Sequence, residues 1–542
     1  MRVYPGLRRL VPLVAGITAF AMGVGSPSHA TFPTPDVREA AFDFGVGAFE
    51  VTRTSAIVWT RAGQDADVLL ELSASRPPSG RVFRLHPSAS NDNTVRKRVT
   101  GLEPGTVYYY RFSQPSRSLR SGVGRFMTAP RRDSTRTVRF GLSGDADGSR
   151  AKGQSQPFWN TRPGNNGFGA ESFGVYRQMA LEPNAFNVNL GDTIYSDSDI
   201  GGAKPALSVA AKWAKYRQNL ILANSRRVRA ATGMYADWDD HEFVDDFSKA
   251  EYGTALYDAG RTAFEDYMPA RFSPDTGLYM HQRWGRNLEV FRLDERSFRS
   301  AKASANHTCD NPQTHQPDLA PTAPQSTRNT FALLVPSLSE PVAKACKARI
   351  RNPSRTMLGK PQLERFLHDV HASGALWKVV LNEVPVQQFY ALPYDRWEGY
   401  EAERKELLRR LQRLGVDHLV FITTDTHANL LNVVRYRTLE SGGPVPSPYQ
   451  EFVTGPVSTK TFEREIDDET GNQSAGRLVD AAFFSPPPPN GVGMRCSNVN
   501  VYSYAEVAAA PSALTITAKD VHGNVVRDQS DQTTPCVTRL AP

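Results

Sequence analysis

Apolar segments that end in acidic or histidine-containing clusters recur along the chain after residue 137 and constrain its fold more than any other feature. Each segment has the length of a buried strand, and stretches of helical character separate them. This alternation predicts an α/β architecture, in which side chains at the carboxyl ends of the strands gather into one site. The six segments span 138–142, 186–190, 234–238, 288–293, 377–381 and 418–423.

Two of these strand ends carry aspartates that are ordinary when taken singly. Asp145 and Asp147 follow the first segment, and such a pair is more often a turn or a helix cap than a metal site. Asp192 follows Gly191 after the second segment, where the glycine permits a sharp turn at the strand end. Each pattern indicates a metal site only because similar residues recur after other strands.

The third cluster is much denser. Seven of the twelve residues from 235 to 246 are acidic or histidine, directly after an apolar segment. Carboxylates packed this closely would raise one another's pKa unless cations neutralised them, so the cluster favours a metal site over a solvated face. Asp425 and His427 follow the last strand; alone they would be typical of a hydrogen-bonded pair, but here they complete a fourth cluster.

The N-terminal part of the chain has a different pattern. Short alternating strands such as 55–60 and 68–72 are separated by turn residues about every ten positions. Residues 101–112 are similar to a turn and the following strand of fibronectin-III-like domains. The predicted organisation is a β-sandwich over residues 31–130, a polar linker over 131–136 and a second domain over 137–542.

Residues 1–30 have the pattern of a cleaved export signal. Arg8 and Arg9 precede an apolar stretch, and small residues lead to a predicted cleavage site near Ala30. The alternative, a transmembrane anchor, is disfavoured because the stretch is short and interrupted by proline and glycine. The arginine pair resembles a twin-arginine signal, although its neighbours fit that motif poorly, so both the Tat and the Sec route stay open. The protein is expected in the periplasm, on the cell surface or in the medium, with no transmembrane helix in the mature chain.

Four cysteines fit an oxidising compartment. Three pairings are possible, and none of the cysteines has the close spacing of a zinc or redox site. We expect bridges between sequence neighbours, Cys309 with Cys346 in a polar, proline-rich insert at 300–355, and Cys496 with Cys536 near the C-terminus.

The formal net charge is +8 for 542 residues, which is mild. No run of basic residues interleaved with aromatic residues is present, so the sequence contains no nucleic-acid-binding motif. Phosphorylated small molecules are compatible with this charge. The sequence does not indicate an oligomeric state.

Together these residues resemble the PhoD-like alkaline phosphatase family of the metallophosphatase superfamily. The resemblance covers nearly the whole mature chain. It rests on three motifs, Gly191-Asp192-x-x-Tyr195, Trp238-Asp239-Asp240-His241-Glu242 and Asp425-x-His427. Three further segments, 293–299, 355–359 and 395–400, are also similar to the family in sequence. It implies an α/β fold, a four-layer metallophosphatase β-sandwich flanked by helices, behind the N-terminal all-β fibronectin-III-like sandwich.

The resemblance also implies a metal site. Asp192 would bridge metal ions, Tyr195 would bind Fe(III) as a phenolate, and oxygen ligands would hold Ca²⁺. The wider superfamily would place Mn²⁺ or Zn²⁺ instead. Two positions depart from the family pattern: Asp145 stands where a cysteine ligand is usual, and Asp245 stands where an asparagine is usual. The predicted metal ligands are Asp145, Asp192, Tyr195, Asp240, Asp425 and His427.

The implied reaction is hydrolysis of a phosphate monoester by a metal-activated water. His241 is the predicted proton donor to the leaving oxygen. Arg296 could hold a phosphate oxygen, and pairing with a core carboxylate explains it equally well. Two alternatives stay open: phosphodiester cleavage, including phospholipase-D-like action, and a secreted binding protein that keeps metals only for stability.

Overall fold

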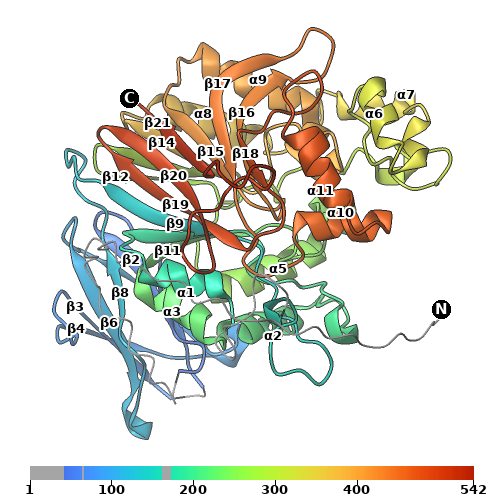
Figure 1. Ribbon diagram of the computed structural model, residues 1–542. Coiled ribbons are helices and arrows are strands. Elements are labelled where there is room, and N and C mark those ends of the chain that lie inside the picture. The colour runs from blue at the N-terminus through green and yellow to red at the C-terminus, as the bar shows by residue number, and fades with distance from the viewer. Residues whose placement is uncertain (1–41, 64–65, 162–171) are drawn as a thin grey trace, which may run out of the picture. The chain divides into compact units, whose positions relative to one another are not determined.

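Two large β-sheets form the centre of the computed structural model, which describes residues 42–63, 66–161 and 172–542 (Figure 1). The predicted signal peptide, residues 1–30, lies outside the described residues. All six predicted strands of the second region are present, each within a residue of its expected bounds. Their positions follow from runs of apolar side chains that are buried on both faces.

The first sheet has nine strands, and its centre is parallel. β9, β10 and β11 run in the same direction, so their carboxyl ends lie at one edge. The strand order is β21 (Val537–Leu540), β20 (Ala513–Asp520), β19 (Ser503–Ala510), β9 (Val138–Ser143), β10 (Phe186–Leu190), β11 (Gly233–Asp237), β1 (Val46–Phe49), β2 (Ser55–Arg61) and β5 (Thr94–Thr100).

The second sheet has seven strands, of which β13, β14, β15 and β17 are parallel. The strand order is β12 (Met280–Trp284), β13 (Leu288–Arg292), β14 (Trp377–Asn382), β15 (Leu419–Thr423), β17 (Val445–Val453), β16 (Asn429–Arg437) and β18 (Cys496–Asn498).

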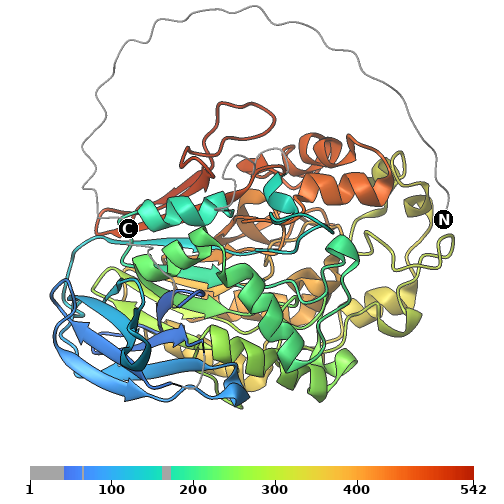
Figure 2. The same ribbon diagram turned by 90° about the horizontal axis from the view of Figure 1, so that it is seen from below.

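These sheets pack face to face and helices cover their outer sides. Side chains from β9, β10, β14 and β15 share one core between the sheets. Helices α1 (Gly174–Leu181), α2 (Val209–Leu220), α3 (Ala223–Ala231) and α5 (Thr254–Tyr267) pack on the first sheet, and α8 (Lys360–His371) and α9 (Glu401–Arg413) pack on the second. Figure 1 shows the resulting order of layers, and in Figure 2 the green helices lie in front of the sheets. The predicted four-layer α/β fold is confirmed.

The N-terminal segment is all-β, as predicted, and one of its two layers belongs to the first sheet. A separate five-stranded sheet consists of β3 (Val68–Ser73), β4 (Arg81–Leu85), β6 (Val107–Gln114), β7 (Leu119–Arg120) and β8 (Gly124–Met127). It packs on β1, β2 and β5, and β1 pairs in parallel with β11 of the first sheet.

β2 shows why this sharing occurs. Ala56 and Val58 face the N-terminal core, while Ile57 and Trp59 face the helices that cover the first sheet. Because both faces are apolar, the strand is buried between two cores. Residues 131–136 form the loop between β8 and β9, and division of the chain into domains at this loop stays a proposal.

Both expected disulfides are present. Cys309 pairs with Cys346, and Cys496 pairs with Cys536. The first lies in the insert that carries α6 (Gln325–Phe331) and α7 (Lys344–Ile350), and the second joins β18 to the residue before β21.

Among the residues that the structure describes, no helix combines the length and the apolar character needed to cross a bilayer.

Candidate metal centre

The predicted site residues follow strands of both sheets. Asp145 and Asp192 come after β9 and β10 of the first sheet, and Asp425 and His427 come after β15 of the second. Ligand atoms of Asp145, Asp192 and His427 lie within 4.8 Å of one another. The two sheets therefore supply one shared cluster at the ends of their parallel strands.

The backbone at these strand ends adopts an uncommon conformation. Asp145, Asp192, Asp425 and His427 have φ values of 62°, 51°, 61° and 54°, in the left-handed region that few non-glycine residues adopt. Gly191 has φ 81°, and a Cβ there would lie 2.5 Å from the Asp239 Cβ. Such conformations are retained where the surrounding structure requires them, and they concentrate at functional sites.

Tyr195 joins the first cluster through its hydroxyl. The Tyr195 Oη lies 3.1 Å from the His427 Nε2. The ring is buried, so its oxygen faces the cluster formed by Asp145, Asp192 and His427 and not solvent. The sequence predicted all four of these residues as ligands, and the structure brings them together.

A second cluster adjoins the first because Asp192 belongs to both. Ligand atoms of Asp192, Asp240 and His241 lie within 4.8 Å of one another. The same holds for Asp239, Asp240 and Asp425. A carboxylate shared between two groups of ligands is suited to bridging two cations.

Three carboxylate oxygens in these clusters are buried without a hydrogen-bond partner among the described residues: Asp145 Oδ2, Asp239 Oδ2 and Asp240 Oδ1. A buried polar atom that lacks a partner is costly and needs an explanation. Cations would satisfy these oxygens, and a donor set of carboxylates, a phenol and imidazoles fits such ions.

Two family models match this sequence. The model described as "PhoD-like phosphatase" matches residues 164–484, more than half of the chain. The chain belongs to the PhoD-like phosphatase family. The model described as "PhoD-like phosphatase, N-terminal domain" matches residues 27–130, which agrees with the all-β segment.

Similar proteins support this assignment. The chain of this PhoD-like phosphatase is 24% identical to "Alkaline phosphatase D" of Bacillus subtilis (strain 168) over 481 residues, which cover 78% of this chain and 70% of that protein. A solved structure described as "Structure of PhoD" matches with a TM-score of 0.67 and 18% identity, over 94% of this chain and 90% of that chain. A purple acid phosphatase, PPD1, from yellow lupin (Lupinus luteus) seeds matches with a TM-score of 0.53 and 12% identity, over 92% and 74% of the two chains. At these identities the two structures demonstrate the shared fold.

Family and site together define the class of reaction. The PhoD-like phosphatase is a phosphoric ester hydrolase, and the clusters of acidic and histidine side chains make it a metal-dependent phosphoesterase. This class differs from the alternative of a binding protein, because the chain has the candidate ligands and belongs to a family of phosphatases.

Burial and mutual repulsion act on the carboxylates of the PhoD-like phosphatase site. Burial raises the pKa of the Asp145 carboxyl to about 7, and the Asp425 charge adds to this while His427 opposes it. Burial likewise raises the pKa of Asp425 to about 6 and that of Asp192 well above its ordinary range. Bound cations would reverse this tendency by favouring the ionised carboxylates.

His241 is held by contacts on several sides. Its ring stacks on Tyr195 with centroids 4.0 Å apart, and its Nδ1 lies 2.7 Å from the Asp197 Oδ1. Burial lowers the pKa of His241, but the charges of Asp192, Asp240 and Asp197 outweigh it and raise the pKa well above 6.5. These neighbouring charges favour the protonated ring, and Asp197 orients it.

Arg296 lies behind the ligand clusters with its guanidinium fully buried. Its Nε donates to Asp239 and its Nη1 donates to Asp395 over 2.8 Å. Its Nη2 lies 3.7 Å from the Asp240 Oδ1 and 3.9 Å from the Asp425 Oδ1, and makes no hydrogen bond to the described residues. Arg296 therefore pairs with core carboxylates and keeps one nitrogen directed at the cluster.

Several supporting residues were not predicted as part of the site. Asp197 orients His241, and Glu465 of α10 (Phe462–Thr470) accepts a hydrogen bond from the His427 Nδ1 at 2.8 Å. Such contacts fix ring orientation and ligand basicity. No local pattern marks Asp197 or Glu465 in the sequence, because each acts through a residue distant along the chain.

Arg396 is a further basic residue at the site that sequence reasoning missed. Its Nε lies 3.8 Å from the Asp425 Oδ2. The only indication of Arg396 in the sequence is that it follows Asp395 in the segment 395–400, which resembles the family. Asp245, by contrast, is exposed: its side chain is 76% accessible and its Oδ1 lies 3.9 Å from the His241 Nε2.

Proposed function

We propose that this chain is an exported enzyme that hydrolyses phosphate monoesters by direct attack of water. The observation that carries the proposal is that Asp192 belongs to two adjoining clusters, one with Asp145 and His427 and one with Asp240, next to which His241 is placed to donate a proton. Such an arrangement suits a pair of cations that clamp one phosphoryl group.

The proposed metals follow from the ligand types. Fe(III) would be held by Tyr195 with Asp145, Asp192 and His427, because phenolate and carboxylate oxygens suit a hard ion. Ca²⁺ would be held by the carboxylates of Asp240 and its neighbours. Mn²⁺ or Zn²⁺ is the alternative occupant of the same ligands.

Bound ions would supply charge neutralisation and activation of water. The chain's own residues would then handle the proton. Asp197 holds the His241 Nδ1, which leaves Nε2 to give a proton to the leaving alcohol. Because the Asp197 carboxylate accepts a hydrogen bond from Nδ1 and favours the protonated imidazole, His241 is suited to act as a general acid.

Arg296 has a positioning role in this proposal. Its hydrogen bonds to Asp239 and Asp395 hold the loop after β11 against the loop before α9. Its Nη2, which lacks a hydrogen-bond partner among the described residues, is directed at the Asp240 and Asp425 oxygens and could also bind a phosphoryl oxygen.

Export is proposed from the N-terminal pattern together with two disulfides, which persist in oxidising compartments. N-terminal sequencing of protein recovered outside the cytoplasm tests this point. A start just after Ala30 is the expected result, and an intact Met1 would contradict it.

The primary test compares an aryl phosphate monoester with the matching diester, in the presence of Ca²⁺ and then of a chelator. Monoester hydrolysis that is lost with the chelator and in Asp192→Asn supports the proposal. Faster diester hydrolysis would make the chain a phosphodiesterase, and no hydrolysis of either ester by metal-loaded protein would favour the binding-protein alternative.

The metal assignment has a separate spectroscopic test. A phenolate bound to Fe(III) absorbs visible light, so purified protein should be coloured and Tyr195→Phe should lose the band. Tyr176→Phe is the matched control, since Tyr176 is also buried but its hydroxyl contacts Asn189. Retention of the band in Tyr195→Phe would contradict the role given to Tyr195.

A further inference from the structure

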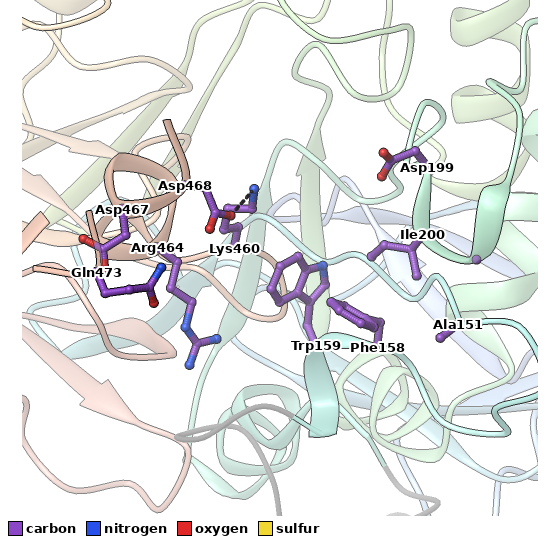
Figure 3. Close-up of a pocket in the computed structure, with 11 residues that line it drawn as sticks. Ala151, Phe158, Trp159, Asp199, Ile200, Lys460, Arg464, Asp467, Asp468 and Gln473 are labelled. Atoms are coloured by element: carbon purple, nitrogen blue, oxygen red, sulfur yellow. Dashed lines mark ion pairs between the residues drawn. The ribbon is translucent and has the colours of Figure 1, made fainter. Parts of the chain in front are cut away.

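A large cavity lies outside the ligand clusters and is not used by the reaction proposed above. Its volume is about 670 Å³, within the range of sites that bind small organic ligands. Figure 3 shows Trp159 between two groups of side chains, with Phe158 and Ile200 on one side and residues of α10 on the other. Its lining includes Phe158, Trp159, Ile200, Lys460, Arg464 and Gln473.

The first wall of this cavity is connected to the β9 strand end. The Phe158 backbone N–H donates to the Ser149 carbonyl over 2.8 Å, and the Ser149 N–H donates to the Asp147 carboxylate over 2.8 Å. Asp147 is two residues from the candidate ligand Asp145. This wall is therefore anchored to the segment that carries Asp145.

The other two walls are connected to the histidines of the site. Ile200 lies three residues after Asp197, which holds His241. Arg464 is adjacent to Glu465, which holds His427. All three walls therefore continue along the chain from segments that carry or orient site residues.

The chemistry of the walls is asymmetric. Trp159 is 9% exposed and makes an edge-to-face contact with Phe158 at 4.9 Å, so its indole is held in place. The α10 side carries charged and amide groups, including Arg464 and an ion pair of Lys460 with Asp468 at 2.8 Å. An aromatic platform opposite polar groups suits a flat ring with polar edges, because stacking binds its face while the polar groups meet its rim.

We propose that this cavity binds the alcohol part of the substrate and that it selects phosphate esters whose alcohol carries a flat, polar ring of the size of a nucleobase. The inference rests on the proposed monoesterase function and adds a substrate class to it. Trp159 is the specificity-determining residue in this assignment. It touches the ring of the substrate and not the reacting phosphoryl group.

The test uses two esters that differ only in the ring. Adenosine 5′-monophosphate and ribose 5-phosphate have the same primary alcohol as leaving group, so their ratio of kcat/KM isolates the ring. The wild-type ratio should favour the nucleotide by about 5- to 150-fold, the range that stacking on an aromatic side chain gives. Trp159→Leu should bring the ratio close to one by lowering kcat/KM for the nucleotide much more than for ribose 5-phosphate, and Trp159→Phe should keep part of the preference.

Trp213→Leu is the matched control, because Trp213 lies on α2 with its indole bonded to Asp266 and does not line the cavity. It should leave the ratio unchanged. A wild-type ratio near one, or equal loss of both activities in Trp159→Leu, would overturn the assignment while the proposed function stands. If neither ester nor an aryl phosphate is hydrolysed, the proposed function fails. In that case, calorimetric binding of adenosine that is lost in Trp159→Leu would still support the assignment of the cavity as a ring-binding site. Absence of adenosine binding would overturn that assignment.

Discussion

Two sets of buried carboxylates occur in this protein, and they differ in their partners. Glu451 accepts backbone N–H groups of Val386 and Gln387 at 2.7 and 3.0 Å, and Glu398 accepts those of Phe389 and Tyr390. Glu242 accepts from the backbone of Thr193, Asp239 and Asp192. In the candidate ligand set, Asp145, Asp239 and Asp240 each keep an oxygen without a partner among the described residues.

Burial alone does not separate these two sets. It raises the pKa of Glu451 and Glu398 in the same direction as that of Asp145. The two sets differ in what offsets the cost of burying the carboxylate. Backbone N–H groups donate hydrogen bonds to the glutamates, which thereby hold loops together, whereas the aspartates depend on a cation. Removing a metal should therefore affect only the second set.

The largest expected effect is that of Asp192→Asn. Loss of the shared ligand should lower monoester turnover on the order of 10² to 10³-fold, because charge stabilisation at the phosphoryl group is lost. In the presence of a chelator the variant should be at least as stable to heat as wild type, since a crowded buried charge has been removed. Melting curves with and without chelator check this, and destabilisation in both conditions would place Asp192 with the structural carboxylates.

His241→Ala should separate proton transfer from binding of the ester. Turnover of an alkyl phosphate, whose leaving group needs a proton, should fall about 10²-fold, and turnover of an aryl phosphate should fall less. Steady-state rates on the two esters measure the difference. Equal losses on both would remove the general-acid role, and Asp197→Asn should show the same pattern more weakly.

Glu465→Gln tests a carboxylate that contacts the candidate ligand His427 and is not itself a predicted ligand. Loss of the charged partner of His427 should weaken metal affinity by about 10- to 100-fold. Metal content after dialysis against graded free metal measures this. Glu469→Gln, an exposed position on the same helix, should retain wild-type affinity, and a similar loss there would show that the effect is not specific to His427.

Glu451→Gln tests the structural set. The side-chain NH₂ of the new glutamine would face a backbone N–H, and two donors cannot hydrogen-bond to each other. The free energy of unfolding should therefore fall by about 1–3 kcal/mol. Denaturant unfolding should give the same loss with and without chelator. A loss that appears only in metal-loaded protein would mean that Glu451 belongs to the metal site.

The smallest effect is expected at Glu506 of β19, a buried carboxyl that is bonded by the Asn184 amide at 3.3 Å. Burial and then the Glu182 charge raise its pKa to about 8. A raised carboxyl pKa means that the folded state resists ionisation, so wild-type stability should decline as pH rises from 4.5 to about 8. Glu506→Gln should lose this part of the decline, which unfolding measured across that pH range would detect; identical pH profiles would contradict it.

Much of this architecture was predictable because it depends on local patterns. The strands 186–190 and 377–381 are apolar runs followed by polar residues, and such runs form strands buried on both faces. The sharing of β1, β2 and β5 with the first sheet was not predicted. The sequence of β2 is apolar on both faces, but which two cores bury it depends on the pairing of β1 with β11, in which Ala48 lies opposite Gly233, 185 residues later in the chain.

By itself, the sequence determined the strands, the residue types at their ends, the disulfide partners and the family. Only the tertiary structure decided that Asp192 belongs to two ligand groups, that Glu465 and Asp197 hold the histidines, and that Glu451 is satisfied by backbone N–H groups. The reason is physical. Strand formation depends on neighbours along the chain, whereas the partner of a buried charge is set by packing between segments distant in sequence.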